Sequence, residues 1–91
     1  MSKYGIHNTP KEVMILMATN VRSIRKEKKI TQKELSARAG VAYATIMKFE
    51  STGIISLESL LKICQALGRL AEFESILQSS NLDSKQNLFD I

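Results

Sequence analysis

Apolar residues recur at intervals of three and four along much of this chain, which is the spacing that places them on one face of a helix. Thr9, Pro10 and Glu12 have the sequence of a helix start, in which Thr9 is the cap and Glu12 closes a capping box. We predict a first helix from residue 10 to about Lys28, preceded by a loose arm of residues 1–9. Its inward face would consist of Val13, Leu16 or Met17, Val21 and Ile24.

Residues 31–50 predict two further helices joined by a tight turn. Thr31 and Glu34 form a second capping box, and Gly40 can adopt the left-handed conformation that ends a helix. The positions that would face inward are Leu35, Ala39, Val41, Ile46 and Phe49. Two short helices in this arrangement form a helix-turn-helix, whose second helix directs its outer face toward the major groove of DNA.

The rest of the chain predicts two more helices and a polar tail. After a turn at Ser51-Thr52-Gly53, the core resumes at Ile54 and Ile55, and Ser56 caps a fourth helix that ends at Gly68. A short fifth helix would carry the apolar stripe Leu70, Phe73, Ile76 and Leu77. We therefore expect one domain, residues 10–78, followed by a polar C-terminal tail, residues 79–91, which becomes apolar again at Leu88, Phe89 and Ile91.

Positive charge is concentrated in one half of the sequence. Residues 1–50 carry ten basic and four acidic side chains, whereas residues 51–91 carry three basic and five acidic side chains. A basic surface around a helix-turn-helix favours phosphate binding, because neutralised phosphates release condensed counterions. Without the motif, the same charge would fit a solvated basic helix equally well.

The composition excludes several other classes of protein. The 91 residues contain one cysteine, Cys64, and one histidine, His7, so we expect neither an internal disulfide nor a zinc site. Cys64 is interpreted as a small core residue. No apolar run approaches the roughly 20 residues that span a bilayer, and the N-terminal segment lacks a signal-peptide core. We therefore expect a cytoplasmic protein with no membrane partner.

The segment Thr31-Gln32-x-Glu34-Leu35-Ser36-x-x-Ala39-Gly40-Val41, followed by Thr45-Ile46-x-x-Phe49-Glu50, resembles the phage-repressor and Cro-like helix-turn-helix regulators, also called the Xre family. The resemblance extends over roughly three quarters of the chain. It implies an all-α, five-helix phage-repressor-like DNA-binding domain. It also implies sequence-specific binding of duplex DNA by a homodimer, on an inverted-repeat operator, to repress transcription.

By the same resemblance, the outer face of the second helix of the motif contacts base edges. Lys48 can donate to guanine N7 and O6, and Tyr43 can donate or stack. Ala42, Ala44 and Met47 can touch thymine methyl groups. Lys48 could instead contact a phosphate, and Met47 could be exposed filler. The sequence departs from the family because Ala42 replaces the common Ser or Thr cap and because no Gln or Asn is placed to pair with adenine, so we expect apolar contacts and DNA shape to contribute.

The resemblance also implies contacts to the DNA backbone. Gln32 matches a position whose side chain and backbone N–H hold a phosphate at a helix N-terminus. Thr45 and Ser51 match further backbone-contacting positions. Basic residues that would either contact phosphates or remain solvated are Arg22, Lys26 and Lys33.

Arg25 and Glu50 match an ion pair that, in repressors of this family, bridges the first helix to the end of the recognition helix. We interpret them as structural. No second acid, histidine partner or activated nucleophile accompanies them in the sequence, so we expect no enzymatic activity and no cofactor.

Three biological interpretations remain open. Residues 49–63 are similar to small regulators paired with Hip-type kinase toxins, which implies an autoregulatory antitoxin that also binds a Hip-like kinase toxin. The first alternative is a stand-alone Xre-type repressor. The second is a protein-interaction module that has lost DNA binding, although such a module would not need the basic half. The expected dimer or partner contacts are Phe73, Ile76, Leu77, Leu88, Phe89 and Ile91.

Overall fold

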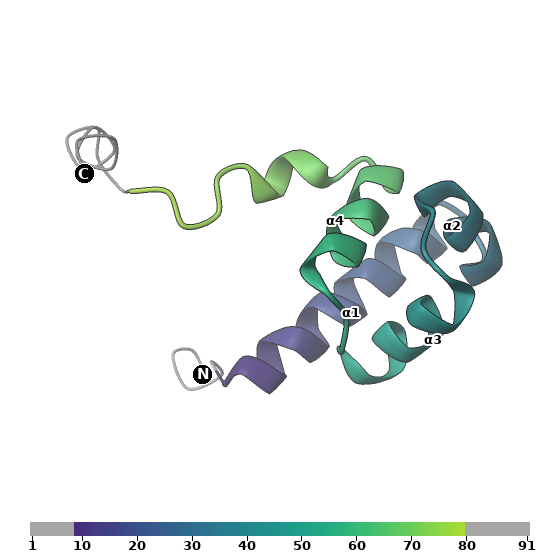
Figure 1. The fold of residues 1–91 in the computed structure, drawn as a ribbon, viewed down its shortest axis with the longest axis horizontal. Coiled ribbons are helices and arrows are strands. Elements are labelled where there is room, and N and C mark those ends of the chain that lie inside the picture. Colours follow the sequence, from purple (N-terminus) through teal and green to yellow (C-terminus); the bar gives the residue numbers. More distant parts are fainter. Residues whose placement is uncertain (1–8, 80–91) are drawn as a thin grey trace.

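The computed structural model describes residues 9–79, and this part of the chain is helical and contains no strand. Four α-helices follow one another: α1 (Pro10–Glu27), α2 (Gln32–Ala39), α3 (Tyr43–Thr52) and α4 (Leu57–Ala66). A short 3-10 helix, η2 (Leu70–Phe73), comes after them. Figure 1 shows α1 as the long diagonal of the domain, with α2 and α3 gathered at one end of the view and η2 leading away from α4.

The helix starts follow the predicted capping residues. Thr31 Oγ1 accepts the N–H of Glu34 at 3.0 Å, and Glu34 Oε1 accepts the N–H of Thr31 at 2.7 Å. Thr9 and Glu12 make the same reciprocal pair, and the Ser56 hydroxyl caps α4 by accepting from the N–H of Ser59. Each such cap stabilises its helix by about 1 kcal/mol. The predicted starts of α1, α2 and α4 are therefore confirmed.

One face of each α-helix forms the hydrophobic core. Helix α1 packs against α3, helix α2 packs against α3 and α4, and η2 packs against α4. Leu35, Ile46 and Phe49 are buried as the pattern predicts, and Val41 is buried between α2 and α3. The remaining buried apolar residues are Ala18, Val21, Ile30, Leu60, Ile63, Cys64 and Leu67.

Two glycines end helices in the left-handed conformation for different reasons. Gly40 has φ +70°, and a Cβ added there would meet no atom within 4 Å, so only the backbone conformation favours glycine. Gly53 has φ +82°, and an added Cβ would lie 2.9 Å from the carbonyl carbon of Met14. Gly53 therefore also allows the end of α3 to approach the backbone of α1.

The predicted fifth helix is not confirmed as an α-helix. Only Leu70–Phe73 form a helix, of the 3-10 type, and residues 74–77 continue as turns. Leu77 has a positive φ of 64° and is 97% exposed, and Ile76 is exposed as well. Only Phe73 of this stripe packs against the core, and a single half-buried side chain does not compensate for the unfavourable nucleation of a longer helix.

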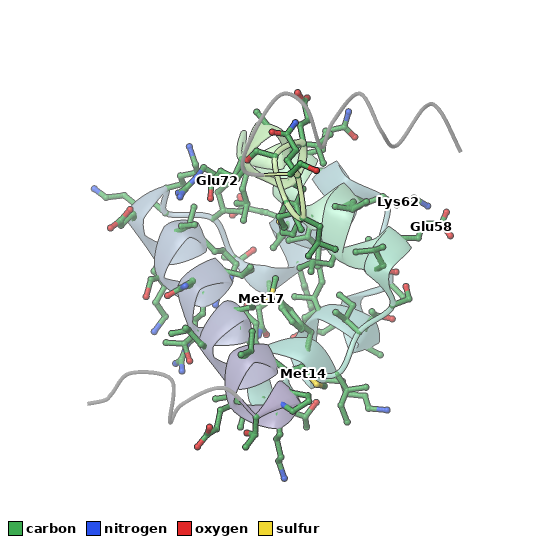
Figure 2. All side chains as sticks on the ribbon, turned by 90° about the vertical axis from the view of Figure 1, so that its left-hand side faces the viewer. Met14, Met17, Glu58, Lys62 and Glu72 are labelled. Atoms are coloured by element: carbon green, nitrogen blue, oxygen red, sulfur yellow. The ribbon has the colours of Figure 1, made fainter. Side chains whose placement is uncertain are left out.

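The core begins later on α1 than its periodicity indicates. Val13 and Leu16 are exposed, Leu16 by 57%, whereas Met17 is half-buried against the core. In Figure 2 Met17 lies beside the space between α1 and α4, while Met14 lies near the N-terminal end of α1. Ile54 is likewise exposed, and only Ile55 returns to the core. Of the two alternatives Leu16 and Met17, Met17 is therefore the residue that faces the core. The predictions for Val13 and Ile54 are wrong, and on α1 core packing begins only at Met17 and Ala18.

Candidate nucleic-acid interface

Helix α3 packs against the hydrophobic core through one face and leaves its opposite face exposed. Ile46 and Phe49 are fully buried, while Ala44, Met47 and Lys48 are exposed on the opposite side. Tyr43, the first residue of the helix, is 37% exposed. Ala42, also exposed, is the N-cap. All five predicted base-contacting residues are thus accessible, and their contact with bases remains a prediction.

Ala42 makes no side-chain cap hydrogen bond, unlike the caps of the other three α-helices. The first N–H groups of α3 consequently have no side-chain acceptor. Unpaired donors and the positive end of the helix dipole are suited to an anion or to an electronegative base edge. The missing cap, noted in the sequence as a departure, leaves these donors available at the start of the recognition helix.

A hollow of about 310 Å³ joins α1, α2 and α3 next to the exposed face of α3. It brings together residues that lie far apart in the sequence and that were predicted for three different purposes. Its lining consists of Arg22, Arg25, Gln32, Met47, Glu50 and Ser51. Three predicted phosphate contacts, one predicted base contact and the predicted ion pair therefore surround one concave surface.

The ion pair between Arg25 and Glu50 lies at the base of this hollow, and the structure confirms it. Arg25 Nε donates to Glu50 Oε2 at 2.8 Å, and the second nitrogen, Nη2, donates to Glu50 Oε1 at 2.9 Å. The third nitrogen, Nη1, donates to the backbone oxygen of Ile30 at 2.8 Å. The two side chains are only 10% and 4% exposed. This bidentate pair ties α1 to the end of α3 and to the loop before α2.

The charged form of both partners is favoured. Burial by itself would raise the pKa of Glu50, but the hydrogen bonds from Arg25 and Gln32 and the charges of Arg25 and Arg22 outweigh it, so the pKa is lowered. The hydrogen bond to Glu50 in turn raises the pKa of Arg25. Glu50 is therefore a carboxylate at neutral pH, and it offsets part of the positive charge around the hollow.

The Gln32 side chain has a hydrogen-bond partner within the protein that the sequence does not reveal. Its Nε2 donates to Glu50 Oε1 at 3.0 Å, so the amide is anchored to the ion pair. One further N–H of this amide and the backbone N–H at the first position of α2 remain as donors for a phosphate. The network fixes the orientation of the side chain that the resemblance assigns to phosphate binding.

The other predicted phosphate contacts differ in their surroundings. Ser51 Oγ donates its proton to the backbone oxygen of Lys48 at 3.1 Å, so a phosphate contact would require this bond to break. Thr45 is half-buried, Arg22 lines the hollow and Lys26 is exposed on α1 outside the lining. Lys33 is also exposed, but its Nζ lies over the Tyr43 ring, 5.5 Å from the centroid. The structure thus places Arg22, Gln32 and Ser51 around the hollow, and Lys26 outside it.

The predicted dimer or partner residues are not brought together in the described part of the chain. Phe73 is half-buried in a second groove, of about 390 Å³, between α1, α4 and η2, while Ile76 and Leu77 are exposed. Leu88, Phe89 and Ile91 lie outside the described residues.

Cys64 is buried beside the groove between α1, α4 and η2. Burial raises the pKa of its thiol, in agreement with a core residue.

Within residues 9–79 the side chains do not suggest a metal centre. No group of three histidine, cysteine, aspartate or glutamate residues in this region is placed to hold a metal ion. Nor does any helix in the same range have both the length and the apolar character needed to cross a membrane.

Comparison with known proteins relates the sequence to one family of domains. The sequence model of the Cro/C1-type helix-turn-helix DNA-binding domain matches residues 20–69, which include α2, α3 and α4. No curated protein matches the chain. The match covers more than half of the 91 residues, and it includes the Arg25–Glu50 pair and the exposed face of α3. The chain therefore belongs to the family of Cro/C1-type helix-turn-helix DNA-binding domains.

Proposed function

We propose that this DNA-binding protein is a sequence-specific transcriptional repressor that inserts α3 into the major groove of duplex DNA. The observation that carries the proposal is the exposed face of α3 beside a hollow lined by Arg22, Gln32 and Ser51. A helix of this size fits the major groove of B-DNA, where each base pair presents a distinct pattern of donors and acceptors. Phosphates would lie over the hollow while the outer residues of α3 reach the bases.

Within this arrangement the residues divide into two groups. Tyr43 and Lys48 supply donors to base edges, while Ala42, Ala44 and Met47 supply apolar contact to thymine methyl groups. The expected backbone contacts are Gln32, Arg22, Lys26, Lys33, Thr45 and Ser51. Gln32 has the strongest support among them, because Glu50 already holds its side chain in place.

We further propose that the protein acts as a homodimer on an inverted repeat. One helix in one turn of the groove makes few contacts, whereas two copies can span half-sites about 34 Å apart. Exposed apolar side chains support two candidate contact regions. The first is the N-terminal half of α1, with Val13, Ile15 and Leu16, and the second is the segment after α4, with Ile76 and Leu77.

We also propose that the partner in the cell is a Hip-like kinase toxin, so that the protein is an autoregulatory antitoxin. Two features support this proposal: the similarity of residues 49–63 to regulators of that kind, and the exposed apolar residues of α1 and of the segment after α4. The alternative is a stand-alone repressor, which uses the same DNA-binding surface without the toxin.

A binding-site selection with purified protein tests the DNA-binding proposal. Lys48→Ala should lose about 1–3 kcal/mol at the selected site and relax the preference at one base pair, because a base-edge donor is removed. Gln32→Ala should weaken all sequences alike. Lys62→Ala is the matched control, because Lys62 lies on α4, outside the motif, and its Nζ pairs with Glu58 Oε2 at 3.3 Å. Figure 2 labels both side chains. Unchanged base preferences in the Lys48 variant would contradict the assignment of that residue.

The two association proposals have separate tests. Sedimentation of the protein alone and bound to a selected operator should give the mass of a dimer and a footprint on both half-sites. A monomer that protects one half-site would refute the dimer. Co-purification with the product of a neighbouring toxin gene should give a stable complex, and deletion of residues 79–91 should weaken that complex while leaving DNA binding nearly unchanged. Absence of such a gene would favour the stand-alone repressor.

A further inference from the structure

A cation–aromatic contact joins α2 to α3 at the edge of the recognition surface. Lys33 is the second residue of α2, and Tyr43 is the first residue of α3. Lys33 Nζ lies 5.5 Å from the centroid of the Tyr43 ring, within the roughly 6 Å over which a cation is attracted to an aromatic face. The two side chains are both exposed, at the end of α3 that would enter the groove first.

The Tyr43 ring has few partners on its own helix. Ala42 and Ala44 flank it in the sequence, and Ala42 makes no cap bond at this end of the helix. Met47, four residues further along α3 and 40% exposed, is spaced to offer apolar contact to the ring but no charge. Lys33 supplies a charged contact from the other helix of the motif, and this contact favours the orientation of the ring that faces the ammonium.

Lys33 is available for this contact because no carboxylate pairs with it in the described part of the chain. Its neighbour Glu34 accepts the backbone N–H of Thr31 in the capping box. An ammonium over the ring at an exposed site changes the population of a side-chain orientation by about two- to fivefold. That factor is too small to affect folding, but it is large enough to affect discrimination between base pairs.

We propose that Lys33 is a specificity-determining positioning residue, which acts by holding the Tyr43 ring in the orientation that contacts a base pair. Lys33 and Tyr43 then form one recognition unit, built from both helices of the motif. The proposal rests on the proposed function, because it requires α3 to read the major groove. It differs from the phosphate contact expected from the sequence, since a phosphate contact carries no direct base preference.

The test is a quantitative binding-site selection with four variants. Lys33→Met keeps the length of the side chain and removes the charge, and it should reduce the preference at one base pair by about two- to fivefold. Lys33→Arg keeps a cation over the ring and should retain the preference. Tyr43→Leu should lose the preference at the same base pair. Adding Lys33→Met to the Tyr43 variant should then change no base preference further.

Lys26→Met is the matched control, because it removes one positive charge from an exposed lysine of α1 that has no aromatic partner among the described contacts. It should weaken all DNA sequences alike. If Lys33→Met also weakens all sequences by one common factor, Lys33 is only a phosphate contact and the inference is wrong. The inference is also wrong if Lys33→Met alters base preference equally with and without the Tyr43 ring.

These outcomes are separable from a failure of the proposed function. A parent protein that selects no sequence at all would refute sequence-specific binding itself, and the inference with it. A parent protein that selects a defined site, together with a Lys33→Met variant of identical profile, would refute the inference alone.

Discussion

Replacing Arg25 by alanine gives the sharpest test of how the binding surface is held together. The guanidinium makes all three of its hydrogen bonds to Glu50 and to the oxygen of Ile30, so the substitution removes every one of them. It leaves the Glu50 carboxylate, whose side chain is 4% exposed, with the Gln32 amide as its remaining hydrogen-bond partner among the described residues. The polar link between α1 and the end of α3 is lost with it, while the packing of the two helices remains.

The size of the effect follows from the burial of the pair. Removal of one partner of a buried ion pair costs about 3–5 kcal/mol, because the other charge stays buried without compensation. The unpaired oxygen of Ile30 is part of the same loss and is not added separately. Since a small domain unfolds with roughly 5–15 kcal/mol, Arg25→Ala should remove a large part of its stability. Lys26→Ala, at the next position on α1, removes an exposed charge and should cost about 0–1 kcal/mol.

Urea titrations followed by circular dichroism at neutral pH measure this difference directly. We expect a much lower midpoint for Arg25→Ala than for Lys26→Ala, and an intermediate one for Arg25→Lys, because an ammonium cannot make the parallel bidentate contact. Equal midpoints for the Arg25→Ala and Lys26→Ala variants would refute the reasoning, since they would show that the pair is solvated or makes no net contribution.

Three further results are expected. Gly53→Ala should lower the thermal midpoint more than Gly40→Ala. Both substitutions force alanine into a left-handed conformation, which costs about 1–2 kcal/mol, but only at Gly53 does the new Cβ lie 2.9 Å from the Met14 backbone. Equal thermal midpoints for the two variants would exclude that clash. The folded-state pKa of Glu50 is lowered, so the stabilising contribution of this carboxylate is complete above its unfolded-state pKa of about 4.3 and is lost as the pH falls through its folded-state pKa. The difference in unfolding free energy between the parent and Glu50→Gln should therefore shrink only in acid. A difference that stays constant down to the folded-state pKa would contradict this expectation. The Cys64 thiol is buried and its pKa is raised, so it should react with a disulfide reagent only at the rate at which the protein unfolds. Rapid reaction in native buffer would show that the core around Cys64 opens without unfolding.

The sequence by itself determined the features that depend on residues a few positions apart. The capping boxes at Thr9 and Thr31, the cap at Ser56 and the stop at Gly40 each form within one helical turn or one backbone conformation. Their sequence signals are therefore sufficient, and the helix-turn-helix with its buried and exposed faces follows from them. The Arg25–Glu50 pair also came from the sequence, through the resemblance to the family and not through spacing.

The tertiary structure decided everything that depends on which elements lie opposite one another. The hydrogen bond from Gln32 to Glu50 joins residues 18 positions apart, and the contact of Lys33 with Tyr43 depends on the angle between α2 and α3. Gly53 is required by the approach of α1, which no local signal near the glycine indicates.

The same reason explains the sequence predictions that were wrong. Val13 and Leu77 have apolar side chains at helical spacing, yet they are exposed by 40% and 97%. Periodicity shows which residues share a face, but burial requires a second element to cover that face. Core packing on α1 begins only at Met17 and Ala18, and among residues 70–77 Phe73 is the side chain that packs against the core. The extent of the partner elements, which only the tertiary structure contains, therefore decided where the core ends.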